Sequence, residues 1–136
     1  MALFEQRRRS SRSSHRLFGG SSRLDVAGVS EYQLALFDLV GRRVEGRVSV
    51  PVVAMLVPEP DEVIAVYAMG ESNEPMKVGW IGADDAAEIS SVVSAHNAEG
   101  TDVALRGTID GYWDRRRGLG GLRLWLMYDP DDFRMR

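Results

Sequence analysis

Cysteine is absent from the 136-residue chain, and histidine occurs only twice. Without cysteine the chain cannot form disulfides, use a thiol nucleophile or build the common cysteine-containing zinc sites. This composition fits a reducing compartment, so we expect a cytoplasmic protein. No second histidine and no spaced set of carboxylates accompanies His96, and His15 lies in a separate N-terminal segment. We therefore expect no metal, no cofactor and no catalytic activity.

Long apolar runs are also missing. The longest stretch without a charged residue extends from Val48 to Pro58. This is well short of the roughly 18 apolar residues that a helix needs to span a bilayer. The N-terminus is basic and rich in serine, but it lacks the apolar segment of a secretory signal. We therefore expect no membrane partner.

Charge is divided unevenly along the chain. Residues 1–23 carry six arginines and one glutamate, whereas the rest carries 11 basic and 19 acidic residues. Residues 1–23 contain too few apolar side chains to offset the entropy of ordering, so we expect a disordered basic arm. Such an arm is either a solvated tail or a sequence-independent phosphate contact. We expect a single domain over residues 24–129, followed by a polar tail over 130–136.

Apolar patterning predicts short strands separated by turn residues. Strands are expected at residues 24–29, 48–57, 63–69, 76–81, 102–113 and 122–128. Helices are expected at 31–40 and 82–97, where apolar residues recur near helical spacing. This order predicts an α+β fold, a small OB-like or SH3-like β-barrel of about six antiparallel strands with two helices.

Aromatic and basic residues occur together near the end of the chain. Trp113 precedes Arg115, Arg116 and Arg117 in a glycine-rich loop, and Trp80 lies near the end of the strand expected at 76–81. Rings at strand ends and in loops are placed to stack on bases, and arginines to hold phosphates. The alternative for the loop is a solvated hairpin tip that blunts a sheet edge. Trp125, inside the last strand, is expected to pack.

Four short motifs, in order, resemble the HIRAN domain, a module found fused to DNA-repair translocases and also alone in bacteria and phages. They are VAGVSEYQ at 26–33, LVPEPD at 56–61, AVY at 65–67 and VGWI at 78–81, the last followed by an alanine-rich helix. The resemblance covers roughly residues 24–128. It implies an OB-like barrel that holds the free 3′ end of single-stranded DNA.

The resemblance also implies roles for individual residues. Tyr32 corresponds to a stacking aromatic, Asp61 or Glu62 to the acidic residue that receives the terminal hydroxyl, and Trp80 to a residue that approaches the DNA. The chain departs from the family in three ways. Around Ser30 and Glu31 it lacks the arginine and the second aromatic that can occur there. The loop after the PEP sequence is short, and Asp84 and Asp85 follow Trp80 where the family has basic residues.

Two functions are compatible with these features. The first is a non-catalytic domain that binds single-stranded DNA ends through Tyr32, Asp61, Trp80, Trp113 and the arginines 115–117. The second is a protein-interaction or assembly module on the same barrel, with a protein partner or a second copy of the chain. The acidic domain and the missing basic positions favour the second function, because phosphate contacts supply most non-specific nucleic-acid affinity.

Overall fold

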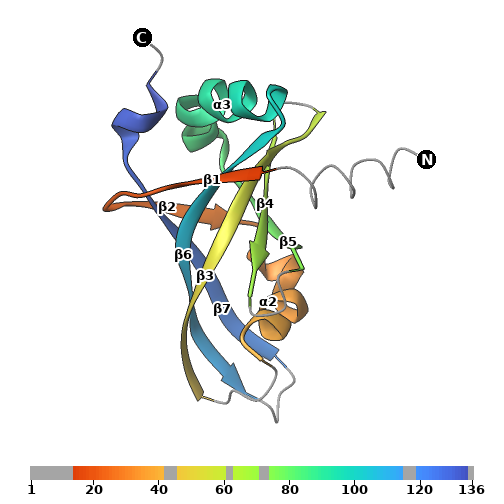
Figure 1. Cartoon of the computed structure of the whole chain (residues 1–136). Helices are drawn as coiled ribbons and strands as arrows, with labels where there is room; N and C mark the ends of the chain where they lie inside the picture. Colours follow the sequence, from red (N-terminus) through yellow and green to blue (C-terminus); the bar gives the residue numbers. More distant parts are fainter. Residues whose placement is uncertain (1–13, 42–45, 61–62, 71–73, 115–118, 135–136) are drawn as a thin grey trace, which may run out of the picture.

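The computed structural model describes residues 14–41, 46–60, 63–70, 74–114 and 119–134 (Figure 1). The described elements, in chain order, are β1 (Ser14–Phe18), β2 (Ser22–Ala27), the 3-10 helix η1 (Val29–Tyr32), α2 (Gln33–Leu39), β3 (Gly46–Pro58), β4 (Ile64–Met69), β5 (Met76–Ile81), α3 (Ala83–Ala98), β6 (Thr101–Asp114), β7 (Leu119–Tyr128) and the 3-10 helix η3 (Pro130–Phe133).

Six of these strands close into an antiparallel barrel. Its order is β6-β3-β4-β5-β2-β7, and β7 pairs back with β6. Gly111, in the long strand β6, has φ 135° and lies where a side chain would collide with the backbone of Gly121. Glycine permits this close approach of β6 and β7. The expected α+β barrel of six antiparallel strands with two helices is therefore confirmed.

Alternate residues of each strand fill the barrel, as period-two patterning requires. In β3, for example, Val48, Val52, Ala54 and Leu56 are buried in the core. Helix α3 covers one end of the barrel and adds Ile89 to that core, whereas α2 packs against β5 and β7 (Figure 1). No helix in the described part of the chain is long and apolar enough to cross a membrane.

Strand β1 lies outside the barrel and pairs in parallel with β6. It occupies the edge of β6 from Thr101 to Leu105, whereas β7 pairs with that same strand only from Gly107 onward. The ring of Phe18 packs 5.5 Å from His96 and 5.5 Å from Phe133. The expected disordered arm is therefore wrong for residues 14–23, which form β1 and begin β2. Residues 1–13 lie outside the described residues.

The C-terminal segment also belongs to the domain. Asp129 caps η3, because its carboxylate accepts a hydrogen bond from the Asp131 backbone N–H at 3.0 Å. This short helix brings Phe133 against Tyr128, where only 2% of Phe133 is exposed. The prediction of a polar tail is therefore wrong for residues 130–133, because burial of the Phe133 ring holds this segment against the domain.

Candidate functional site

Polar and aromatic side chains gather on the outer surface of β3, β4 and β5. The inward residues of β4 and β5, such as Val66 and Ile81, belong to the core, so Tyr67 and Trp80 point outward. Ala65 pairs with Trp80, and Tyr67 pairs with Lys77. An irregularity in the pairing between Val66 and Tyr67 separates these two pairs and shifts Lys77 relative to Trp80.

The ring of Trp80 lies directly on Gly28. This glycine has φ 76°, in the left-handed region, and a side chain there would collide with the Trp80 indole. Because Ala27 pairs with Trp80, the end of β2 brings Gly28 beneath the ring. The glycine therefore allows both the sharp turn into η1 and the close packing of the indole against the backbone. Trp80 remains partly exposed.

A groove of about 860 Å³ opens beside Trp80, between the β3–β4 turn and α3. The turn is tight, because the Glu59 N–H donates a 2.7 Å hydrogen bond to the carbonyl of Val63. The side chains that α3 contributes are all small, and the groove is lined by Pro58, Glu59, Val63, Ile64, Trp80, Ile81, Ala83, Ala86, Ala87, Ser90, Ser91 and Ser94. A space of this size falls in the range of about 300–1,000 Å³ that is typical of ligand sites.

An ion pair borders the groove. Lys77 Nζ lies 3.1 Å and 3.3 Å from the two carboxylate oxygens of Glu59, and both side chains are about one-third exposed. The hydrogen bond to Glu59 raises the pKa of Lys77. Burial raises the pKa of the Tyr67 phenol, and the Glu59 carboxylate raises it further. The phenol of Tyr32 adds a smaller contribution to both pKa shifts.

Of the site residues expected from the sequence, Tyr32 and Trp80 lie on neighbouring elements, because η1 packs against β5. Tyr32 is partly buried against the core. Asp61 and the arginines 115–117 lie outside the described residues, as does Glu62. Val63, which follows the Asp61–Glu62 pair in the chain, lines the groove.

Trp113 is not available for stacking on a base. It is only 4% exposed, and its ring stacks on Phe37 with 4.1 Å between ring centroids and 12° between planes. The expectation of an open ring at the mouth of the loop is therefore wrong. Helix α2 brings Phe37 against the Trp113 ring, and Trp113 forms part of the core.

Three residues of this surface were missed by the sequence reasoning: Glu59, Tyr67 and Lys77. Tyr67 could have been found from alternation, because Ile64, Val66 and Ala68 are apolar and the intervening positions of β4 then point outward. The Glu59–Lys77 pair carries no comparable signal, since it depends on how the β3–β4 turn folds back toward β5.

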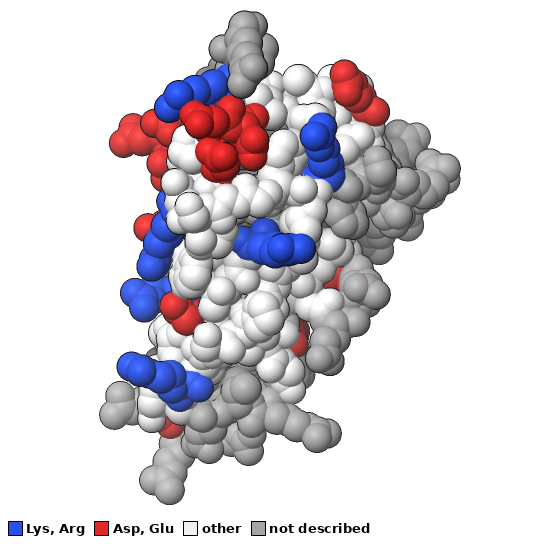
Figure 2. Space-filling model, turned by 60° about the vertical axis from the view of Figure 1, so that its left-hand side comes forward, with Lys and Arg blue, Asp and Glu red and all other residues white. Residues whose placement is uncertain are grey.

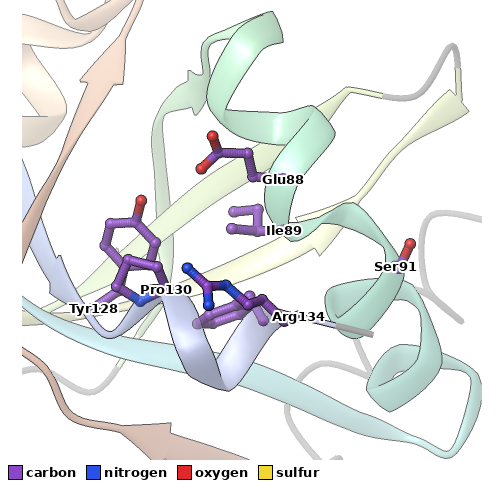
Figure 3. A pocket seen from close by; sticks show the side chains of 7 residues that line it. Glu88, Ile89, Ser91, Tyr128, Pro130 and Arg134 are labelled. Carbon is purple, nitrogen blue, oxygen red and sulfur yellow. The ribbon is translucent and has the colours of Figure 1, made fainter. Parts of the chain in front are cut away.

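A second, smaller pocket of about 470 Å³ lies between α3 and the C-terminal segment. Figure 3 shows Glu88 from α3, Tyr128 from the end of β7 and Arg134 after η3 around it. Burial raises the pKa of the Tyr128 phenol, and the nearby Glu88 and Asp85 raise it further. Arg134 is engaged by Asp131 at 2.9 Å. The acidic setting makes this pocket a poor site for an anion.

Charge differs sharply between parts of the surface. No Lys or Arg is found among the described residues that line the larger groove. Figure 2 shows acidic side chains gathered near the top of one view and basic side chains spaced over the face below them. Among the described residues no three His, Asp or Glu side chains converge to hold a metal ion.

The chain was compared with protein-family models, curated proteins and solved structures. None of the three comparisons finds a match, so the function has to be argued from the geometry of this surface.

Proposed function

We propose that the chain is a non-catalytic domain that binds single-stranded DNA and takes its 3′ end in the groove beside Trp80. The observation that carries the proposal is the partly exposed indole of Trp80 at the side of a nucleotide-sized groove. An aromatic face next to a groove suits a base, because base–aromatic stacking contributes about 1–3 kcal/mol and tolerates any sequence.

The four segments that resemble the HIRAN domain support this proposal, because they gather around Trp80. Ala27 and Gly28 of the first segment lie against Trp80, and Pro58 and Glu59 of the second line the groove. Ala65 of the third segment pairs with Trp80, which itself belongs to the fourth. Segments that are far apart in the sequence thus share one location on the barrel.

The chemistry of the site follows from the side chains. Trp80 stacks on the terminal base, and Tyr32 and Tyr67 offer phenols near the sugar. Lys77 is the nearest described cation, and it exchanges its Glu59 partner for a phosphate when DNA binds. Asp61, next to the groove in the chain, accepts the hydrogen bond of the terminal 3′ hydroxyl. The roles given to Lys77 and Asp61 are expectations of this proposal.

Fluorescence anisotropy with single-stranded oligonucleotides tests the proposal at low and moderate salt. We expect tighter binding of a free 3′ hydroxyl than of a 3′ phosphate, and steep weakening with salt. Trp80→Ala should weaken binding by about 5- to 150-fold, the equivalent of one lost stack. Leu34→Ala, which removes a 72% exposed apolar side chain on α2, is the matched control and should bind normally.

The proposal fails if Trp80→Ala binds as tightly as the unchanged protein and the 3′ phosphate makes no difference. The alternative function, a protein-interaction module that uses the same groove, is then favoured. The absence of cations among its described lining residues and the small side chains of α3 favour that alternative. Sedimentation at increasing concentration tests whether the partner is a second copy of the chain.

A further inference from the structure

The outer surface of β2, β7, β6 and β3 carries a second group of basic and aromatic residues. Outward positions on these strands hold Arg23, Arg47, Arg106, Tyr112, Arg123 and Trp125, a set that we call the arginine face. The intervening residues, such as Leu24, Ile109 and Leu124, belong to the core. None of these six residues belongs to the groove beside Trp80.

Strand register places the members of the arginine face side by side. Arg47 pairs with Tyr112 across β3 and β6, and Trp125 pairs with Thr108 of β6 and with Asp25 of β2. Residues that pair directly across an antiparallel sheet have Cβ atoms about 4.5–5.5 Å apart. The face is therefore continuous from β3 to β2, with Trp125 near its centre.

Two contacts fix the Trp125 ring. Its indole N–H donates a 2.9 Å hydrogen bond to Asp110, and the guanidinium of Arg23 lies 5.2 Å from the ring centroid. Asp110 also lies 3.5 Å from Arg123. A held indole with a guanidinium over it is a rigid stacking platform, because little conformational freedom is lost when a base joins it.

The charge balance of the arginine face is positive. Asp25 pairs with Arg23 at 2.7 Å and Asp110 pairs with Arg123, but no ion pair holds Arg47 or Arg106 within the described chain. The acidic residues of α3 and η3 lie outside this face, at the α3 end of the barrel. Two exposed arginines are therefore free to contact an anion.

Strand β2 connects the arginine face to the groove. Ala27 pairs with Trp80 on one side of β2, and Asp25, the preceding outward residue, pairs with Trp125 on the other. Neighbouring strands lie about 4.8 Å apart and Asp25 lies two residues from Ala27 along β2, so the backbones of the two tryptophans are about 12 Å apart. A DNA strand that leaves Trp80 has to cross β2 and move two residues along it to reach Trp125.

We propose that the arginine face binds the sugar-phosphate backbone of the same single strand, on the 5′ side of the nucleotide held at Trp80. This inference rests on the proposed function and extends it from an end-binding pocket to a track across β2. Trp125 with Arg23 stacks on a second base, and Arg106, two residues from the Trp125 partner Thr108, holds a nearby phosphate. Arg47 lies six residues of β3 away from Val53, the partner of Arg106, so it holds a more distant phosphate, about 20 Å along the strand direction.

Oligonucleotides of increasing length test the track. With a free 3′ hydroxyl, affinity should rise from a dinucleotide to a strand of about eight nucleotides, and Arg47→Gln/Arg106→Gln should remove most of that gain. The double variant should also lower the slope of log affinity against log salt by about 1.4, since each lost phosphate contact on a single strand contributes about 0.7. Dinucleotide binding should stay unchanged.

Arg134→Gln is the matched control, because Arg134 is 74% exposed but lies in the C-terminal segment, paired with Asp131, and is not part of the arginine face. The track is overturned if Arg134→Gln weakens long oligonucleotides as much, per arginine removed, as the double variant does. It is equally overturned if the double variant weakens the dinucleotide as much as the longer strand. Failure of the proposed function looks different: Trp80→Ala and a 3′ phosphate then have no effect, whatever the arginine variants do.

Discussion

At the scale of single residues, the seat of Trp80 on Gly28 is the contact on which the groove depends. Gly28 is in the left-handed region with φ 76°, and no side chain fits between it and the indole. Gly100 adopts nearly the same conformation, with φ 83°, but has no atoms near the position of a side chain. Substitutions at Gly100 therefore measure the backbone cost alone, whereas substitutions at Gly28 add the cost of displacing the Trp80 ring.

We predict that Gly100→Ala lowers the free energy of unfolding by about 1–2 kcal/mol, the cost of the left-handed conformation for a residue with a side chain. Gly28→Ala should cost more and should shift the tryptophan emission maximum, because the indole has to leave its seat. Urea unfolding and fluorescence spectra measure both effects. Equal losses of stability with identical spectra would contradict the described packing of Trp80.

Residue-scale outcomes also show what local sequence reasoning can predict. Tyr32 and Trp80 were selected from short motifs that keep their order along the chain, and their roles in DNA binding stay predictions. The burial of Trp113 could have been predicted from alternation, because Trp113 keeps the parity of Leu105, Gly107 and Ile109, which are buried in β6. The three arginines that follow it instead favoured an open ring. Its stacking partner Phe37 could not be predicted, because that residue lies in a helix far earlier in the sequence.

At the scale of secondary-structure elements, alternation predicted most strands because each has one face in the core. The strand expected at 76–81 matches β5, and the strand expected at 102–113 differs from β6 by one residue at each end. Strand β1 was missed, because its sequence SHRLF is short, contains an arginine and shows no alternation. It forms through pairing with β6 and through the contacts of Phe18, which a local pattern does not encode.

Strand β1 should therefore depend on Phe18. We predict that Phe18→Ala lowers the free energy of unfolding by about 1–3 kcal/mol, less than a fully buried phenylalanine, because Phe18 is only partly buried. Hydrogen exchange at the β6 amides that pair with β1 should accelerate in the variant. Leu17→Ala is the control, since Leu17 is 41% exposed and should change exchange little. Unchanged exchange in Phe18→Ala would mean that the backbone pairing alone holds β1.

At the scale of the whole molecule, three groups link the stability of the barrel to alkaline pH. The pKa values of Tyr67, Tyr128 and Lys77 are all raised in the folded state. Above the unfolded pKa values of about 10 the folded state then holds more protons than the unfolded chain, so stability falls as pH rises. Below that range the contribution of these groups is fully present.

We predict that these groups leave the urea midpoint of unfolding unchanged from neutral pH to about pH 9.5. The midpoint then falls as the pH rises through their pKa values in the folded state. Replacing both tyrosines, in Tyr67→Phe/Tyr128→Phe, should make the fall above pH 10 shallower. Absorbance near 295 nm, which follows tyrosinate formation, should show Tyr67 and Tyr128 ionising at higher pH than tyrosine in the unfolded chain. A double variant with an unchanged alkaline profile would show that the phenols are not the cause.

The parallel pairing of β1 with β6 also has a consequence in time. Ser14 pairs with Thr101, so β1 leaves the ribosome well before its partner β6 has been synthesised. Loop closure over such a distance is slow compared with the closure of the β3–β4 and β6–β7 hairpins. Between the synthesis of β6 and its pairing with β1, the edge of β6 is open to any other extended chain, including a neighbouring nascent copy. Strand β1 is thus made well before the strand whose edge it protects.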